Sequence, residues 1–187
     1  MELDHTNGPG EAPPFSEIYA QLMSTPVTTW SDVQWLREQW DGPFVVKGLY
    51  RGEEAKRAVD IGADAIVVSN HGGNNLASTY ASIRTLPAVA RAVDGQDEVW
   101  FDGGIRRGMD VAKALALGAD IVLVGRLWIF GLAAGGQQGV QDLLEMVRDG
   151  LHWSLVGLGH RSFKDLSPDD IVAPDGFFID PDRGTQF

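Results

Sequence analysis

Short apolar runs alternate with amphipathic segments along most of this chain. Four strands are predicted from the apolar runs, at residues 43–48, 65–68, 98–101 and 120–124. Capping residues and glycine stops predict helices between them, at residues 31–40, 53–61, 87–93 and 109–117, with a long helical region at about 138–155. Because strands and helices alternate, the strands should be parallel and joined by helical crossovers. An open doubly wound sheet and part of a (β/α)8 barrel both fit this α/β pattern.

The N-terminal part lacks this regularity. Residues 1–15 are rich in glycine, proline and acidic residues, and residues 16–28 are only weakly helical. We therefore expect a flexible or irregular lead over residues 1–28 and a single domain over residues 29–187. Ser31 and Gln34 have the spacing of a capping box at the start of the first clear helix. Pro87 is expected at the first turn of a later helix.

Composition narrows the function classes. The chain has 187 residues, 44% of them hydrophobic, no cysteine and a formal net charge of −11. An acidic chain is a poor partner for nucleic acid or anionic membranes, and the lack of cysteine excludes disulfides and thiolate metal sites. No apolar run reaches the roughly 18 residues of a membrane span, and the N-terminus lacks the pattern of a secretory signal. A cytoplasmic protein is expected.

Polar and glycine residues follow all four predicted strands. The strand ends read Lys47-Gly48, Ser69-Asn70-His71-Gly72-Gly73, Asp102-Gly103-Gly104-Ile105-Arg106-Arg107 and Gly125-Arg126. In either architecture ligands bind where parallel strands end. Glycines let a ligand approach the backbone, and N–H groups at a helix start can hold a phosphate. The third and fourth strand ends therefore predict a phosphate site.

Each of these signals also has a purely structural interpretation. Lys47 could extend out of the sheet to solvent, and His71 could be an ordinary hydrogen-bonded loop histidine. Asp102 could cap a turn, and Arg126 could pair with an acidic residue. Two arginines at a helix start could simply be solvated, although cations there oppose the helix dipole and so favour a nearby anion.

The motifs VVKG, SNHGG, DGGIRRG and VGR, in this order and spacing, resemble the FMN-dependent α-hydroxy acid oxidase and dehydrogenase family. The resemblance covers residues 31–174. It implies a (β/α)8 barrel with FMN at the strand ends, of which these four strands would be strands five to eight, the C-terminal half. It also implies that Lys47 lies near flavin N1 and O2, that Ser69 approaches the flavin and that His71 is the active-site base. The ribityl and phosphate path of FMN would be lined by Asp102, Gly104, Arg106, Gly125 and Arg126, and no metal is expected.

The loop after the second strand departs from the usual family pattern. Asn74 stands where the family commonly has an arginine that binds the substrate carboxylate. The strings SNHGGNNL, LGLGH and LSPDDIV resemble the pre-mycofactocin synthase branch, although Ala77 departs even from that branch. The resemblance implies a small-molecule substrate that contacts Asn74, a mycofactocin-precursor amino-lactam rather than a simple 2-hydroxy acid.

The chain supplies four βα units, whereas eight units need roughly 200 residues or more. We therefore expect an FMN-dependent oxidoreductase that is incomplete without an N-terminal half barrel, which would supply flavin contacts and the carboxylate that orients the base. A half barrel has two open sheet edges, so the partner could be an N-terminal half-barrel chain or a second copy. One alternative is a catalytically inactive half barrel that binds phosphate, FMN or a partner chain. Another is a different FMN or nucleotide barrel with a similar phosphate site.

Overall fold

The computed structural model describes residues 15–24 and 26–184. Residues 1–14, which make up most of the acidic and proline-rich stretch expected to be flexible, lie outside the described residues. The chain divides into two compact units, residues 1–36 and 37–187.

The first unit contains α1 (Phe15–Met23) and most of α2 (Trp30–Gln39). The capping pair of α2 is Thr29 and Asp32: the backbone N–H and the hydroxyl of Thr29 each donate to Asp32 Oδ2 at 2.7 Å. The backbone N–H of Asp32 donates back to Thr29 Oγ1 at 3.4 Å. The hydrogen bonds from Thr29 lower the pKa of Asp32. The prediction that Ser31 and Gln34 form the capping box was therefore wrong by two residues.

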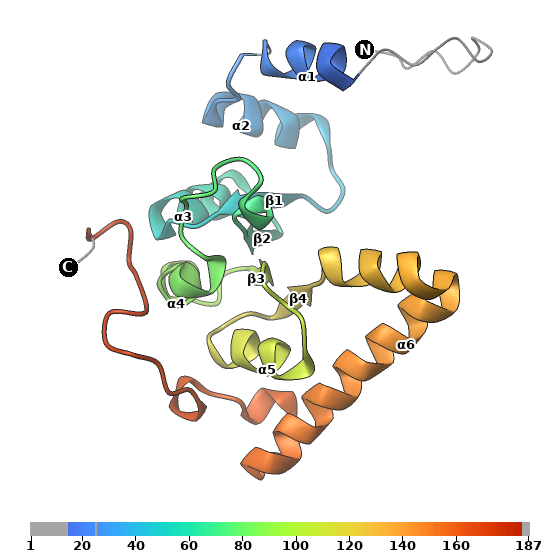
Figure 1. Ribbon diagram of the computed structural model, residues 1–187. Helices are drawn as coiled ribbons and strands as arrows, with labels where there is room; N and C mark the ends of the chain where they lie inside the picture. Colours follow the sequence, from blue (N-terminus) through green and yellow to red (C-terminus); the bar gives the residue numbers. More distant parts are fainter. Residues whose placement is uncertain (1–14, 25, 185–187) are drawn as a thin grey trace. The chain divides into compact units, whose positions relative to one another are not determined.

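The second unit is built on one parallel sheet of four strands (Figure 1). The strands are β1 (Val45–Leu49), β2 (Ala65–Val68), β3 (Glu98–Asp102) and β4 (Ile121–Leu123). They lie in the order in which they occur along the chain. The crossovers contain α3 (Gly52–Ile61), α4 (Ser82–Val93) and α5 (Gly108–Ala116). The alternating α/β pattern predicted from the sequence is confirmed.

The strand order determines where the crossover helices lie. Crossovers between parallel strands are almost always right-handed, so strands added in one direction place their helices on one face of the sheet. Figure 1 shows α3, α4 and α5 along one side of the strands. A doubly wound sheet reverses its strand order and carries helices on both faces. The consecutive order therefore lacks the reversal of a doubly wound sheet.

The core lies between the sheet and these helices. Ile66 and Val68 of β2 are level with Val99 and Phe101 of β3, and all four are almost fully buried. The opposite face, which includes Trp100, is less well covered. At the two sheet edges, Val45 of β1 and Ile121 of β4 each remain 38% exposed. The second unit therefore has one packed face and one partly open face.

Two helices begin earlier than predicted. α4 begins at Ser82, so Pro87 lies in its second turn rather than at its start. Proline there removes one backbone hydrogen bond, but the buried stripe that includes Leu86, Val89 and Val93 holds the helix against the sheet. The prediction that this helix starts at Pro87 was therefore wrong.

The last helix, α6 (Arg126–Leu158), begins about twelve residues before the predicted helical region. It bends sharply at Gly135 and Gly136, which leave helical geometry, and the bend is visible in Figure 1. Across the bend, a side chain at Gly139 would collide with the carbonyl of Gly131. The glycines that obscured this helix in the sequence thus allow its two parts to pack closely. Within the described residues no helix is both long and apolar enough to cross a membrane, α6 included.

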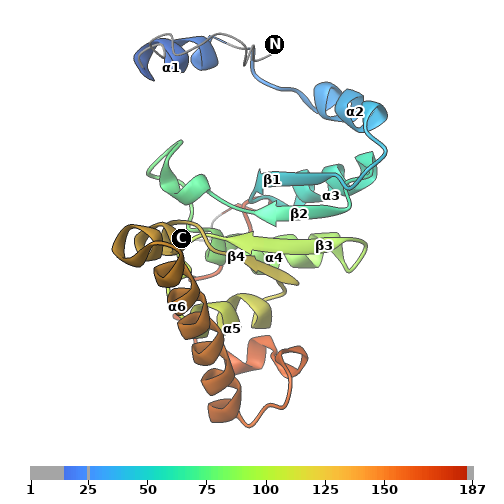
Figure 2. The ribbon, with the colours of Figure 1, turned by 90° about the vertical axis from the view of Figure 1, so that its right-hand side faces the viewer.

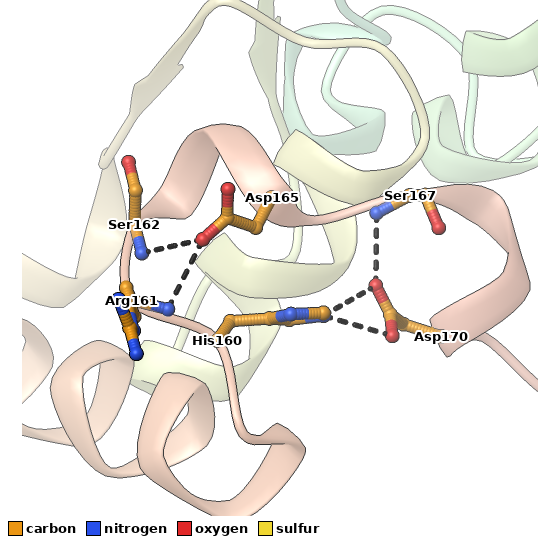
Figure 3. Close-up of polar contacts among 6 residues, drawn as sticks. All are labelled: His160, Arg161, Ser162, Asp165, Ser167 and Asp170. Carbon is orange, nitrogen blue, oxygen red and sulfur yellow. Dashed lines mark hydrogen bonds and ion pairs between the residues drawn. The ribbon is translucent and has the colours of Figure 1, made fainter.

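The segment after α6 is held by capped turns (Figure 3). His160 Nε2 lies 3.0 Å from both carboxylate oxygens of Asp170, and the backbone N–H of Ser167 donates to Asp170 Oδ2. These bonds, first that from Ser167 and then that from His160, lower the pKa of Asp170. Further along, Arg84 of α4 donates to the carbonyl of Phe177 at 2.6 Å. The C-terminal segment is thereby attached to the helix layer.

Candidate functional site

The first three strands end beside one another, and polar side chains from all three meet there. The Lys47 ammonium of β1 lies 2.6 Å from Asp102 Oδ2 at the end of β3. It also donates a hydrogen bond of 2.8 Å to Ser69 Oγ, directly after β2. In the parallel register Lys47 is level with Val67 and Trp100, so its long side chain can cross β2 to reach β3. The structure thus brings together three of the predicted cofactor-binding residues.

Ser69 links this ion pair to the turn that follows β2. Its side chain is fully buried, at 0% exposure. Its Oγ accepts the hydrogen bond from Lys47 and a second one, of 3.1 Å, from the backbone N–H of His71. Lys47 and the predicted base are therefore attached to the same buried oxygen atom.

His71 opens a short 3-10 turn, η1 (His71–Gly73). Its φ of +54° lies in the left-handed region, which few residues other than glycine adopt. Its ring lies against Gly48 of β1: a Cβ at Gly48 would be 2.6 Å from His71 Nε2. Gly48 has a φ of +104° and stands where the pairing of β1 with β2 shifts register. The orientation of the imidazole therefore depends on the absence of a side chain at Gly48.

Two further predicted residues line a pocket of about 470 Å³. Arg126 is the first residue of α6, and its Nη2 donates to the carbonyl of Gly72 at 3.3 Å. Figure 2 shows the loop after β2 and the first turns of α6 on the same side of the sheet, where the strands end. The pocket is lined by Gly104 and Arg126 from the predicted cofactor set. Its volume is in the range of small-molecule sites.

The backbone beside this pocket is open to a ligand. Gly104 has a φ of +75°, and Gly125 precedes α6 as its N-cap. A Cβ at either position would meet no atom within 4 Å. A phosphate group could therefore approach both glycines closely, with Arg126 beside them.

The start of α5 is arranged differently from the expectation. Asp110 Oδ2 accepts hydrogen bonds of 3.0 Å from the backbone N–H groups of both Arg106 and Arg107. The cations at this helix start are thus accompanied by a carboxylate of the chain itself, and these two N–H groups are not available to a phosphate. Arg106 does not line the pocket.

Asn74 follows the η1 turn and is exposed. Its backbone N–H donates to the carbonyl of His71 at 3.3 Å. The side chain therefore stands at the open rim near the predicted base, where a substrate could reach it. Among the described residues, no group of three or more acidic, histidine or cysteine side chains could hold a metal ion.

Sequence reasoning missed several residues that shape this site. Gly48 was noted only as part of a strand end, although its positive φ makes room for His71. The far wall of the pocket comes from the C-terminal segment, which has no periodic pattern that would have linked it to the strand ends. These wall residues are Ile171, Val172, Ala173, Pro174, Phe177 and Phe178.

Comparison with known proteins identifies the family. The model of the FMN-dependent dehydrogenase family matches residues 6–173. The chain belongs to the FMN-dependent dehydrogenase family. FMN is the cofactor of this family, as the motifs at the strand ends implied.

Two kinds of curated relative illustrate the similarity. It is 57% identical over 167 residues to pre-mycofactocin synthase from Mycolicibacterium smegmatis, a match that covers 89% of this chain and 42% of the relative. It is 47% identical over 147 residues to an L-lactate dehydrogenase from Pseudomonas aeruginosa, covering 79% of this chain and 39% of the relative. The chain therefore spans about two fifths of the length of the curated relatives that it matches.

Solved structures of the family share the fold. A mandelate oxidase variant with a monooxide FMN adduct superposes with a TM-score of 0.72 at 46% identity, over 74% of this chain and 44% of that one. Mandelate oxidase with (S)-4-hydroxymandelic acid gives the same TM-score and identity, over 74% of this chain and 39% of that one. The parallel α/β fold of this chain is thus shared with mandelate oxidase.

The contact between Gly48 and the His71 ring predicts a specific effect of Gly48→Ala. The new methyl group would meet Nε2, and alanine at a φ of +104° is strained, so we expect a loss of about 1–3 kcal/mol in unfolding free energy. The matched control is Gly95→Ala, which has a positive φ of +69° but no atom within 4 Å of the new methyl. Urea unfolding measures both losses, and NMR of the His71 imidazole should show a change only in Gly48→Ala. An unchanged His71 resonance in Gly48→Ala would contradict the described contact.

Proposed function

We propose that this chain forms the flavin-binding and proton-accepting side of an FMN-dependent oxidoreductase. The observation that carries the proposal is the cluster in which Lys47 and His71 are attached to one buried hydroxyl, Ser69 Oγ, at the ends of parallel strands. A histidine titrates near neutral pH and suits the role of a general base, and a cation beside a flavin favours negative charge on the reduced ring.

The proposed FMN site uses both groups of residues. Gly104, Gly125 and Arg126 would hold the phosphate end, because the backbone there is open and a guanidinium is adjacent. Lys47, Ser69 and Asp102 would lie along the ribityl chain and ring. Arg106 would contribute long-range attraction from the rim, since its backbone N–H is already bonded to Asp110.

Bound FMN would supply the capacity to accept two electrons from the substrate. His71 would take up the proton that the substrate releases, at an imidazole nitrogen. Asp102 would hold the Lys47 ammonium at the strand ends, 2.6 Å away, so that this cation stays directed at the site. Ser69 would keep the base and the cation at a fixed separation.

We propose an amino-lactam related to the mycofactocin precursor as the substrate. Asn74 occupies the position that the resemblance assigns to a carboxylate-binding arginine, and a neutral amide cannot provide a charged two-point contact. An amide can instead exchange hydrogen bonds with the N–H and C=O of a lactam. Higher identity to pre-mycofactocin synthases than to lactate dehydrogenases supports this choice.

The chain would act as the C-terminal half of a (β/α)8 barrel. Its strands run in consecutive order, their second face is partly open, and both edges carry exposed apolar residues. Four further strands on that face would cover Val45, Trp100 and Ile121. In the described residues no side chain bonds to the His71 ring, so the carboxylate that orients it would come from that other half. Without it the unit could bind FMN but not turn over, which is the alternative of an inactive half barrel.

Loss of the Arg126 guanidinium tests the FMN site. Arg126→Ala should weaken FMN binding by about 1.5–3 kcal/mol, or about 10- to 150-fold in Kd, because a charged hydrogen bond to the phosphate is lost. Riboflavin, which has no phosphate, should bind the variant and the native chain equally. Flavin fluorescence quenching gives each Kd, with Arg148→Ala, whose guanidinium pairs with the adjacent Asp149, as the control. Equal FMN affinity in Arg126→Ala and the native chain would reject the site.

Lactate tests the substrate assignment. In the assembled enzyme, lactate should bleach the flavin slowly, and Asn74→Arg should raise the rate about tenfold or more by restoring a charged contact to the carboxylate. Asn75→Arg adds the same charge one residue further along the loop and serves as the control. Rapid bleaching by lactate in the unmodified protein would contradict the proposal.

Co-expression tests the half barrel. The part of the M. smegmatis relative that this chain does not match should form a one-to-one complex with it, because both would bury apolar sheet faces. Ile121→Lys, which places a charge at the open β4 edge, should prevent the complex, whereas Val172→Lys, at a fully exposed position, should not. Analytical ultracentrifugation distinguishes this complex from a homodimer. A compact monomer that unfolds cooperatively and gains no partner would overturn the proposal.

A further inference from the structure

Asn70 lies at the centre of the turn that carries His71. Its Oδ1 accepts a hydrogen bond of 3.0 Å from the backbone N–H of Gly72, and its Nδ2 donates one of 3.2 Å to the carbonyl of Tyr80. Its own backbone N–H donates to Ser82 Oγ at 3.1 Å. One part-buried side chain thus joins the two ends of the loop between β2 and α4.

These bonds act on the residue next to the strained position. His71 keeps a φ of +54° although a histidine gains nothing from that conformation in isolation. The bond from Gly72 to Asn70 Oδ1 spans His71, so it closes the backbone around that residue. The hydroxyl of Ser82, a residue that is only 3% exposed, fixes the backbone N–H of Asn70 from the start of α4. The strained backbone is therefore held from both sides.

The chemistry of the side chain explains why asparagine is suited to this position. The turn requires an acceptor toward Gly72 and a donor toward Tyr80 at the same time, and an amide provides both. Aspartate would keep the acceptor but place a negative charge beside the Tyr80 carbonyl. Serine is too short to reach both groups.

Arg126 contacts the same turn from the pocket side. It donates to the carbonyl of Gly72, whose N–H is bonded to Asn70. Arg126 is exposed, whereas Asn70 is part-buried. Both residues line the pocket, but the hydrogen bonds of Asn70 run to Gly72, Tyr80 and Ser82 of the chain itself. Asn70 can therefore hold the turn when no ligand is bound.

We propose that Asn70 is a positioning residue that holds His71 in its left-handed conformation and so directs the imidazole against Gly48. The inference rests on the proposed function in one respect, because only that function assigns His71 a role in proton transfer. The geometric part concerns this chain alone and can be tested without cofactor.

His71 is exposed overall, but its Nε2 lies against Gly48, so the test measures reagent access to the His71 ring nitrogens in the full chain. Diethyl pyrocarbonate modifies unprotonated histidine rings, and mass spectrometry reports the rate at His71 and at His160. His160 is half-buried and bonded to Asp170, so it reports general loosening of the chain. In Asn70→Ser the ratio of the rate at His71 to that at His160 should rise about threefold or more, because the ring leaves Gly48. Asn70→Asp, which keeps the acceptor, should give a smaller rise.

Two further variants keep the result decisive. Ser82→Ala removes the support of the Asn70 backbone and should shift the ratio in the same direction, which decides the matter if Asn70→Ser does not fold. Asn75→Ala, an exposed amide in the same loop, should leave the ratio unchanged. A native ratio in both Asn70→Ser and Ser82→Ala, or an equal rise at His71 and His160, would overturn the inference. FMN affinity in the same samples is a separate measurement: a native chain that binds no FMN refutes the proposed function, while the modification ratio still decides the role of Asn70.

Discussion

The structure depends on one constraint: a right-handed crossover joins each strand to the next, and each new strand is added at the same edge of the sheet. This constraint puts α3, α4 and α5 on one face and brings all four strand ends to one rim. Residues from separate stretches of the chain then meet without any local sequence relation. Lys47 reaches Asp102 only because β1, β2 and β3 are neighbours in register. The same constraint leaves the second face of the sheet only partly covered.

The functional groups at the rim are separated into two zones. Lys47, Ser69, His71 and Asp102 form a connected cluster, while Gly104 and Arg126 line the pocket. The bond from Arg126 to the Gly72 carbonyl joins the zones through the turn that carries His71. A cofactor with a charged phosphate at one end and a reactive ring at the other matches such a division.

Much of this arrangement was predictable because strand ends carry compact motifs. Apolar runs located the four strands and drew attention to the polar residues at their ends. The cofactor roles of Lys47, Ser69 and Asp102 came from the family resemblance of the motifs that contain them. The start of α6 was missed because it contains several glycines, which usually indicate a loop. Here they allow the two parts of the helix to pack closely across a bend, and hydrophobic periodicity does not reveal such packing. Pro87 was misplaced because burial of Leu86 and Val89 outweighs one lost backbone bond. The role of Asp110 at the start of α5 could not be inferred from the sequence. The backbone N–H groups of Arg106 and Arg107, which it accepts from, were equally suited to a bound phosphate.

The two hydrogen bonds that Ser69 accepts have a directional consequence. A hydroxyl oxygen has two lone pairs, and here one receives the Lys47 ammonium and the other the His71 backbone N–H. The hydroxyl proton of Ser69 is then committed to pointing away from both. A further hydrogen-bond partner of this hydroxyl must therefore be an acceptor, whatever its size or shape.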